Sequence, residues 1–145
     1  MTVKFKIVNQ QQFDKKLAAH AKEVERNLKR AVRMAASETR NTAVMSIMQN
    51  PRAGGTTTRY SPTRTINISA PGDPPAGDTG FLAANIELIM AADGMSADVQ
   101  SRADYSAALE FGTLKMAARP FLQPALEQGR KKYERMFTKA VKDGI

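Results

Sequence analysis

The chain has 145 residues, which fits one domain, and its hydrophobic fraction of 42% is enough for a core. It has no Cys, which excludes disulfides, thiolate metal sites and cysteine nucleophiles, and its single His20 excludes a two-histidine metal site. No apolar run approaches the ~20 residues that span a bilayer. The segment Met1–Phe5 lacks an apolar signal region, so we expect synthesis in the cytosol and no membrane partner.

The net charge of +8 lies in the two terminal parts of the chain. Residues 13–40 hold eight basic and four acidic side chains, and residues 126–145 hold six and three, whereas residues 41–125 are nearly neutral. Such segments either contact phosphates and acidic protein surfaces or form the solvated faces of helices. Few aromatic residues accompany the charges, so the stacking platform of a single-strand binder is missing.

The first third of the chain predicts a strand and then a long helix. Residues 2–8 alternate apolar and polar side chains, as a half-buried strand does. From about residue 11 to Met48, apolar residues recur every three or four positions, and Pro51 ends the pattern. A helix over 13–48 is about 54 Å long, against a diameter of about 40 Å for a compact domain of this size. We expect it to overhang its domain and pack on neighbouring subunits, unless it breaks near 37–41, where helix propensity weakens.

Residues 49–80 predict a long loop or arm with few core residues. The segment is rich in Gly, Pro, Thr and Ser, and only a short stretch over 63–69 alternates as a strand does. Loops this long are usually functional or disordered, and we expect 52–64 to be mobile in the isolated protein and cut first by a protease. Three prolines stiffen residues 70–80. We predict that this arm is a contact element, and that deleting 71–77 leaves the monomer folded.

The rest of the chain predicts a mixture of helices and strands. In chain order we expect a helical turn, two antiparallel strands, a short helix and a terminal helix, over 81–84, 86–91, 95–101, 104–111 and from 120 onward. Asp78 or Thr79 would cap the helical turn, Gly112 would stop the short helix, and Pro120 would occupy the first position of the last helix. The fold class is therefore α+β: a long N-terminal and a C-terminal helix packed on a small antiparallel sheet, in a single domain over 1–145 with a long extended loop.

Three stretches, in this order after a long basic helix, carry a resemblance: APGDPPAGDTGFL over 70–82, ADYSAALEFGT over 103–113 and MAARPFLQPA over 116–125. Together they resemble the small tail-component family of tailed bacteriophages, the neck or tail-completion proteins of the gene-product-ten-like type in lambdoid phages. The resemblance covers most of residues 10–140, except the Thr- and Arg-rich insert at 53–68, where such chains vary most. It implies a non-enzymatic virion protein in the ring-shaped neck that joins the DNA-filled head to the tail, in the manner of a tail-completion or terminator protein.

The resemblance also implies partners and a location. We expect a homo-oligomeric ring, a hexamer that matches tail symmetry as the first choice and a dodecamer that matches the portal as the second. Its neighbours would be head-closure or connector proteins on one side and tail terminator or tail-tube proteins on the other, with packaged DNA in the lumen. The protein would lie in the virion neck or tail, after assembly in the host cytoplasm. No cofactor and no metal is implied.

We predict that the interface residues of such a ring come from the three stretches and from the arginines of the loop: Arg52, Arg59, Arg64, Pro71, Pro74, Pro75, Asp78, Gly80, Glu110, Phe111, Gly112, Arg119, Pro120 and Phe121. Within this set, Glu110 and Arg119 either form an ion pair that clamps the connector between them or are both solvated. Tyr105 and Phe111 are expected to pack in the core.

Two other classes of function, a DNA-binding protein and an enzyme, fit parts of the sequence. A basic DNA-binding protein is the alternative, favoured by the charge, although no helix-turn-helix, RRM or OB pattern is present. A hydrolase or magnesium enzyme could use Asp73 with Asp78, or Asp98 with Asp104. The first pair lies among Pro and Gly, where Asp usually serves turns and caps, so the sequence predicts that the protein is not an enzyme.

Overall fold

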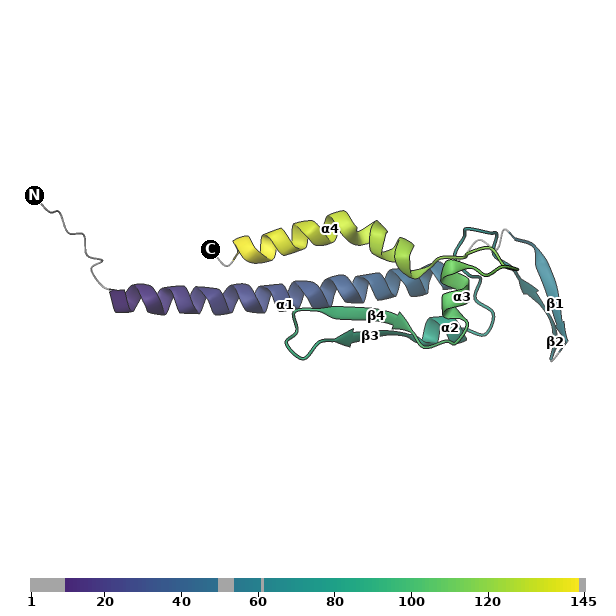
Figure 1. The fold of residues 1–145 in the computed structure, drawn as a ribbon, viewed down its shortest axis with the longest axis horizontal. Helices are drawn as coiled ribbons and strands as arrows, with labels where there is room; N and C mark the ends of the chain where they lie inside the picture. Colours follow the sequence, from purple (N-terminus) through teal and green to yellow (C-terminus); the bar gives the residue numbers. More distant parts are fainter. Residues whose placement is uncertain (1–9, 50–53, 61, 144–145) are drawn as a thin grey trace, which may run out of the picture.

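One long helix carries the rest of the molecule (Figure 1). The computed structural model describes residues 10–49, 54–60 and 62–143. Its elements in chain order are α1 (Gln10–Met48), β1 (Thr56–Tyr60), β2 (Thr63–Asn67), α2 (Phe81–Ala84), β3 (Ile86–Met90), β4 (Ala97–Ser101), α3 (Ser106–Phe111) and α4 (Leu122–Lys142). Helix α4 lies along one side of α1 and the antiparallel pair β3–β4 along the other, while α2, α3 and the β1–β2 hairpin gather at one end. The predicted α+β class is confirmed.

Helix α1 is continuous over 39 residues, about 58 Å, and does not break near 37–41. Two contacts in this region hold it. The hydroxyls of Thr39 and Tyr133 on α4 are hydrogen-bonded at 3.1 Å, and the Arg40 Nε donates to the Ile86 carbonyl of β3 at 2.8 Å. Tertiary contacts on both sides therefore outweigh the weak local propensity.

Small side chains dominate the core. Eight of the thirteen buried hydrophobic residues in the described part of the chain are alanines: Ala31, Ala35, Ala36, Ala43, Ala83, Ala103, Ala125 and Ala140. The largest fully buried side chains are Phe121, Ile47 and Ile86. Alanines on both α1 and α4 let the two helices approach closely, and Lys132 of α4 adds an ion pair to Glu38 of α1 at 2.6 Å.

The predicted overhang of α1 is present. The N-terminal part of the helix extends past the end of α4 and past the β3–β4 turn, and residues 14–19 are all exposed, Leu17 at 57% (Figure 1). The Glu25–Lys29 pair, 2.6 Å apart, supports this part of the helix, and the Lys29 ammonium lowers the pKa of Glu25. Packing of the overhang on a neighbouring subunit stays a prediction. No helix in the described ranges is long and apolar enough to cross a bilayer.

The loop region contains a strand that the sequence did not predict. Strand β1 pairs with β2 in an antiparallel hairpin, with Thr56 opposite Asn67 and Tyr60 opposite Thr63. The missed signal was the run of β-branched threonines 56–58. All five residues of β1 are exposed, so the alternation of buried and exposed positions that marks a strand is absent there.

The other elements agree with the sequence except at the helix starts. The residue before α2 is Gly80, in a left-handed conformation with φ 76°, and neither Asp78 nor Thr79 takes that position. Helix α4 begins at Leu122, so Pro120 precedes the helix and does not start it; Pro124 lies in its first turn. The strand expected over 2–8 lies outside the described residues.

We expect Gly129→Ala to destabilise the protein, although alanine favours helices. A Cβ at position 129 would meet the Tyr133 ring at 2.1–2.4 Å, and Tyr133 is buried and hydrogen-bonded to Thr39. Overpacking costs about 1–3 kcal/mol and the lost hydrogen bond about 1 kcal/mol, against about 1 kcal/mol gained in helix propensity. Urea unfolding measures the difference, with the exposed Gln128→Ala as the control. A Gly129→Ala protein more stable than wild type would show that Tyr133 moves freely.

Candidate functional site

The three stretches that carry the sequence resemblance meet in space. They line a cleft of about 640 Å³ at the end of the molecule where α2, α3 and the hairpin gather (Figure 1). Its walls come from every part of this region: Ile47 of α1, Ile66 of β2, Pro75 of the arm, Leu82 of α2, Leu109 of α3 and Met116 of the connector to α4. In this cleft the arm, the short helices and the connector thus form a common surface.

Glu110 joins α3 to the start of α4. Its carboxylate accepts hydrogen bonds from the backbone N–H groups of Phe121, Leu122 and Gln123 at 2.9, 3.1 and 2.9 Å. The next residue, Pro124, has no N–H, and the N-cap position of α4 makes no side-chain cap of its own. A side chain from another helix therefore satisfies the free donors of α4 and places a negative charge at its positive end.

The predicted Glu110–Arg119 ion pair is wrong, because both side chains bond to backbone. The Arg119 guanidinium donates to the carbonyls of Ser69 (3.3 Å) and Ala117 (3.2 Å), and its backbone N–H donates to Leu109 at 2.6 Å. The two residues do clamp the connector, through separate bonds. Arg119 also ties the connector to Ser69, at the start of the arm.

Gly112 makes the turn from α3 into this connector. Its φ is 77°, and a Cβ there would lie 2.9 Å from the Met116 carbonyl oxygen and from the Ala118 nitrogen. Only glycine fits both the conformation and the close backbone approach. Gly112 therefore stops α3 as predicted, and its place in the motif has a structural cause.

The arm is attached to the core and is not a free extension. Pro75 is buried, the Gly77 N–H donates to the Ile47 carbonyl of α1 at 3.2 Å, and the Gly72 N–H donates to the Ala118 carbonyl at 2.9 Å. The prediction that the arm is a contact element separate from the core is wrong for this part. Removing 71–77 would uncover Ile47, which is 1% exposed.

Asp78 holds the hairpin against the arm. Its carboxylate lies 2.9 Å from the Arg64 guanidinium and 3.5 Å from that of Arg59. The Nε of Arg64 is buried without a hydrogen-bond partner in the described structure. Arg59 and Arg64 thus both contact Asp78, and all three were predicted as interface residues. Asp78 holds the hairpin, whereas the sequence analysis predicted it as a possible cap of the helical turn.

Large apolar side chains are exposed beside the cleft. Phe81 is 53% exposed, Tyr105 46%, Phe111 78% and Leu114 fully exposed, and the rings of Phe81 and Tyr105 lie 6.4 Å apart. We call these four residues the apolar end patch. The expectation that Tyr105 and Phe111 pack in the core is wrong, because α3 has only six residues and turns Leu109 towards the core. Contiguous exposed apolar surface is a mark of interaction sites, and the Phe81–Tyr105 ring pair makes this end of the molecule a candidate for one.

The remaining predicted interface residues differ in accessibility. Pro71 and Gly80 are exposed, whereas Pro74 and Pro120 are half-buried. Phe121 is 1% exposed, so its side chain belongs to the core and does not reach a surface. Arg52 lies outside the described residues.

Asp73, Asp78, Asp98 and Asp104 are the acidic residues that the sequence offered for catalysis. In the parts of the chain that the structure describes, no group of three or more His, Asp or Glu side chains could hold a metal ion. Asp78 faces two arginines, as above. Asp73, Asp98 and Asp104 form no ion pair with any described residue.

Comparison with protein-family models, with curated proteins and with solved structures finds no match to this chain.

Replacing Glu110 by Ala is expected to destabilise the protein by about 1–3 kcal/mol, because three N–H donors lose a charged acceptor. Urea unfolding followed by circular dichroism measures this. Glu127→Ala removes an exposed carboxylate from α4, the helix that Glu110 caps, and should change the free energy of unfolding by less than about 0.5 kcal/mol. Equal effects of the two variants would contradict the capping role.

Asp78→Asn should loosen the hairpin without unfolding the domain. Loss of the Arg59 and Arg64 contacts is expected to speed tryptic cleavage after these two residues severalfold. Global stability should change by less than about 1 kcal/mol, since the arginines are partly exposed. Mass spectrometry of timed digests follows the cleavage, with Asp104→Asn as the exposed control. Unchanged cleavage in Asp78→Asn would mean that the hairpin is held by other contacts.

Proposed function

We propose that the chain is a structural virion protein of a tailed bacteriophage, one subunit of the ring-shaped neck that joins the DNA-filled head to the tail. In this proposal it has no catalytic role. It assembles into a homo-oligomeric ring, a hexamer by first choice, between head-closure or connector proteins and tail terminator or tail-tube proteins. The sequence resemblance of the three stretches is its starting point.

The observation that carries the proposal is the meeting of these stretches in one surface with an apolar rim. Glycine, carboxylate and arginine residues of the motifs fix the connector, and the apolar end patch stands exposed beside it. Many residues of the three stretches are needed to build this surface. A motif that builds an exposed apolar surface suits a protein that binds other proteins.

The shape of the monomer also supports assembly. The N-terminal part of α1 extends past the rest of the described molecule, and the hairpin projects from the opposite end (Figure 1). An isolated two-stranded hairpin is only marginally stable in water, and all five residues of β1 are exposed. Neighbouring subunits would cover these surfaces.

The test uses a phage that lacks this gene and is complemented from a plasmid. Without the protein we expect DNA-filled heads and separate tails that do not join. Phe111→Ser with Leu114→Ser should fail to restore joining, and the purified variant should stay monomeric in light scattering at concentrations where the wild type assembles. Both side chains are exposed, so the melting temperature should fall by no more than a few degrees.

A matched control carries the same chemical change elsewhere. Ile89→Ser with Leu126→Ser alters exposed residues of β3 and α4, away from the apolar end patch, and should restore infectivity. Normal particles from the gene deletion would overturn the proposed function. Full activity of the Phe111 and Leu114 variant would leave the neck role standing and move the interface to another surface.

A further inference from the structure

The fold brings the two basic segments of the chain into one half of the molecule. Residues 10–33 and 126–143 together hold thirteen basic and six acidic side chains. The other described residues hold six basic and eight acidic ones. Because α4 runs back along α1, these segments lie in the half opposite the hairpin and the apolar end patch (Figure 1). The positive field is therefore concentrated at a distance from the apolar surface.

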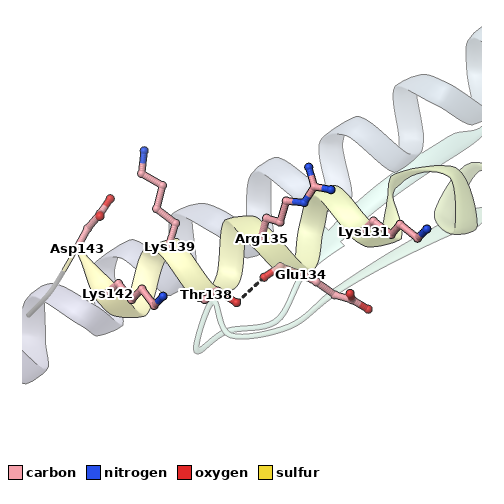
Figure 2. A pocket seen from close by; sticks show the side chains of 7 residues that line it. All are labelled: Lys131, Glu134, Arg135, Thr138, Lys139, Lys142 and Asp143. Carbon is pink, nitrogen blue, oxygen red and sulfur yellow. Dashed lines mark hydrogen bonds between the residues drawn. The ribbon is translucent and has the colours of Figure 1, made fainter.

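Within this half, four cations form a row on α4. Lys131, Arg135, Lys139 and Lys142 follow at intervals of four, four and three residues and are all exposed. They line a shallow groove of about 690 Å³, together with Glu134, Thr138 and Asp143. Figure 2 looks onto this surface with α1 behind α4. We call the four residues the α4 cation row.

The row lies on the solvent side of the helix. The buried residues of α4 are Ala125, Gly129, Tyr133 and Ala140, which pack towards α1. At 100° per residue, Lys131, Arg135 and Lys142 lie on the far side of the helix axis from Tyr133, and Lys139 lies on the flank of the helix nearer Ala125. No element of the described fold covers it.

The row has no acidic partner, although its neighbours do. Lys132 pairs with Glu38 of α1, and Arg130 lies 3.5 Å from Glu134. None of the four cations of the row forms an ion pair or a side-chain hydrogen bond with any described residue. Two carboxylates also line the groove: Glu134 is shared with Arg130, and Asp143 lies at the C-terminal end of the row. The groove therefore keeps an excess of positive charge, four cations against two carboxylates, to present to a partner.

The spacing fits the phosphates of a duplex. Neighbouring cations of the row are three or four residues, about 4.5–6 Å, apart along the helix, and duplex DNA carries one phosphate per about 3.4 Å of its axis on each strand, so several phosphates come within reach of the row. Three of the four cations are Lys, which is depleted in the cores of protein interfaces but common in phosphate contacts. No aromatic side chain lines the groove, so the stacking that single strands require is missing.

We propose that the α4 cation row binds the phosphate backbone of duplex DNA without sequence preference. Its place in the virion rests on the proposed function: in the neck ring, this face of α4 would line the DNA passage. The binding itself is a property of the isolated chain. The proposal thus assigns the α4 face to DNA and leaves the apolar end patch to protein contacts.

The experiment measures binding of a fluorescent 20-base-pair duplex of random sequence by anisotropy, from 50 to 200 mM NaCl. The quadruple change Lys131→Gln, Arg135→Gln, Lys139→Gln and Lys142→Gln should weaken binding at least about tenfold at 100 mM salt. The slope of log K against log salt should become shallower by about 3.6, or 0.9 per lost contact. Circular dichroism confirms the fold, since all four side chains are exposed.

The matched control removes the same charge from other exposed lysines: Lys15→Gln, Lys16→Gln, Lys22→Gln and Lys115→Gln. It should retain most of the affinity and the slope. Equal losses in the two variants would overturn the proposal, because net charge alone would then explain binding. Binding to poly-glutamate as tight as to DNA at the same salt, lost in the row variant, would also overturn it and indicate an acidic protein partner. Absence of duplex binding at 50 mM salt would refute the row's role without touching head–tail joining, which the phage complementation tests separately.

Discussion

The small-residue face of α1 is the constraint on which the other elements depend. Alanines at the contacts allow α4 and the β3–β4 pair to approach α1 closely from two sides, but each alanine removes little apolar area from water. Because only three large side chains are fully buried among the described residues, polar contacts help to place the elements. Thr39 with Tyr133 sets the position of α4, and Arg40 with the Ile86 carbonyl sets that of β3. A thin core of this kind folds the chain and leaves much surface for partners.

At the other end of the molecule, Glu110 couples the fold to the candidate site. By capping α4, its carboxylate fixes both ends of the connector, while Gly112 turns the chain and Arg119 reaches Ser69 at the start of the arm. With the backbone held in this way, Phe111 and Leu114 point outward and stay exposed. A stable helix start and an exposed apolar surface thus have the same cause. This explains why glycine, charged and apolar residues occur together in one short motif.

The helices and the β3–β4 hairpin could be predicted because their signals are local. Apolar residues at helical spacing gave α1 and α4, and alternation around a glycine turn gave β3 and β4. The roles of Glu110, Arg119 and Asp78 could not be predicted in the same way, since the partners that define these roles lie 11 to 50 residues away in the chain and include backbone groups. Strand β1 escaped because all its residues are exposed. The exposure of Phe111 depends on how α3 sits against the core, and composition favours the opposite expectation for an aromatic residue.

The separation of the two surfaces along α1 has a consequence for any assembly. The cation row carries like charges in every copy, so contacts between the rows of two subunits would be repulsive. The apolar end patch and the hairpin carry no comparable row of like charges, so contacts through them have no such penalty. Subunits that associate through the patch end therefore leave the cation rows free. In a closed ring, a shared orientation of α1 would place all rows on one side, where their repulsion is relieved by a polyanion. Both proposed contacts can then form together, because the same long helix keeps them apart.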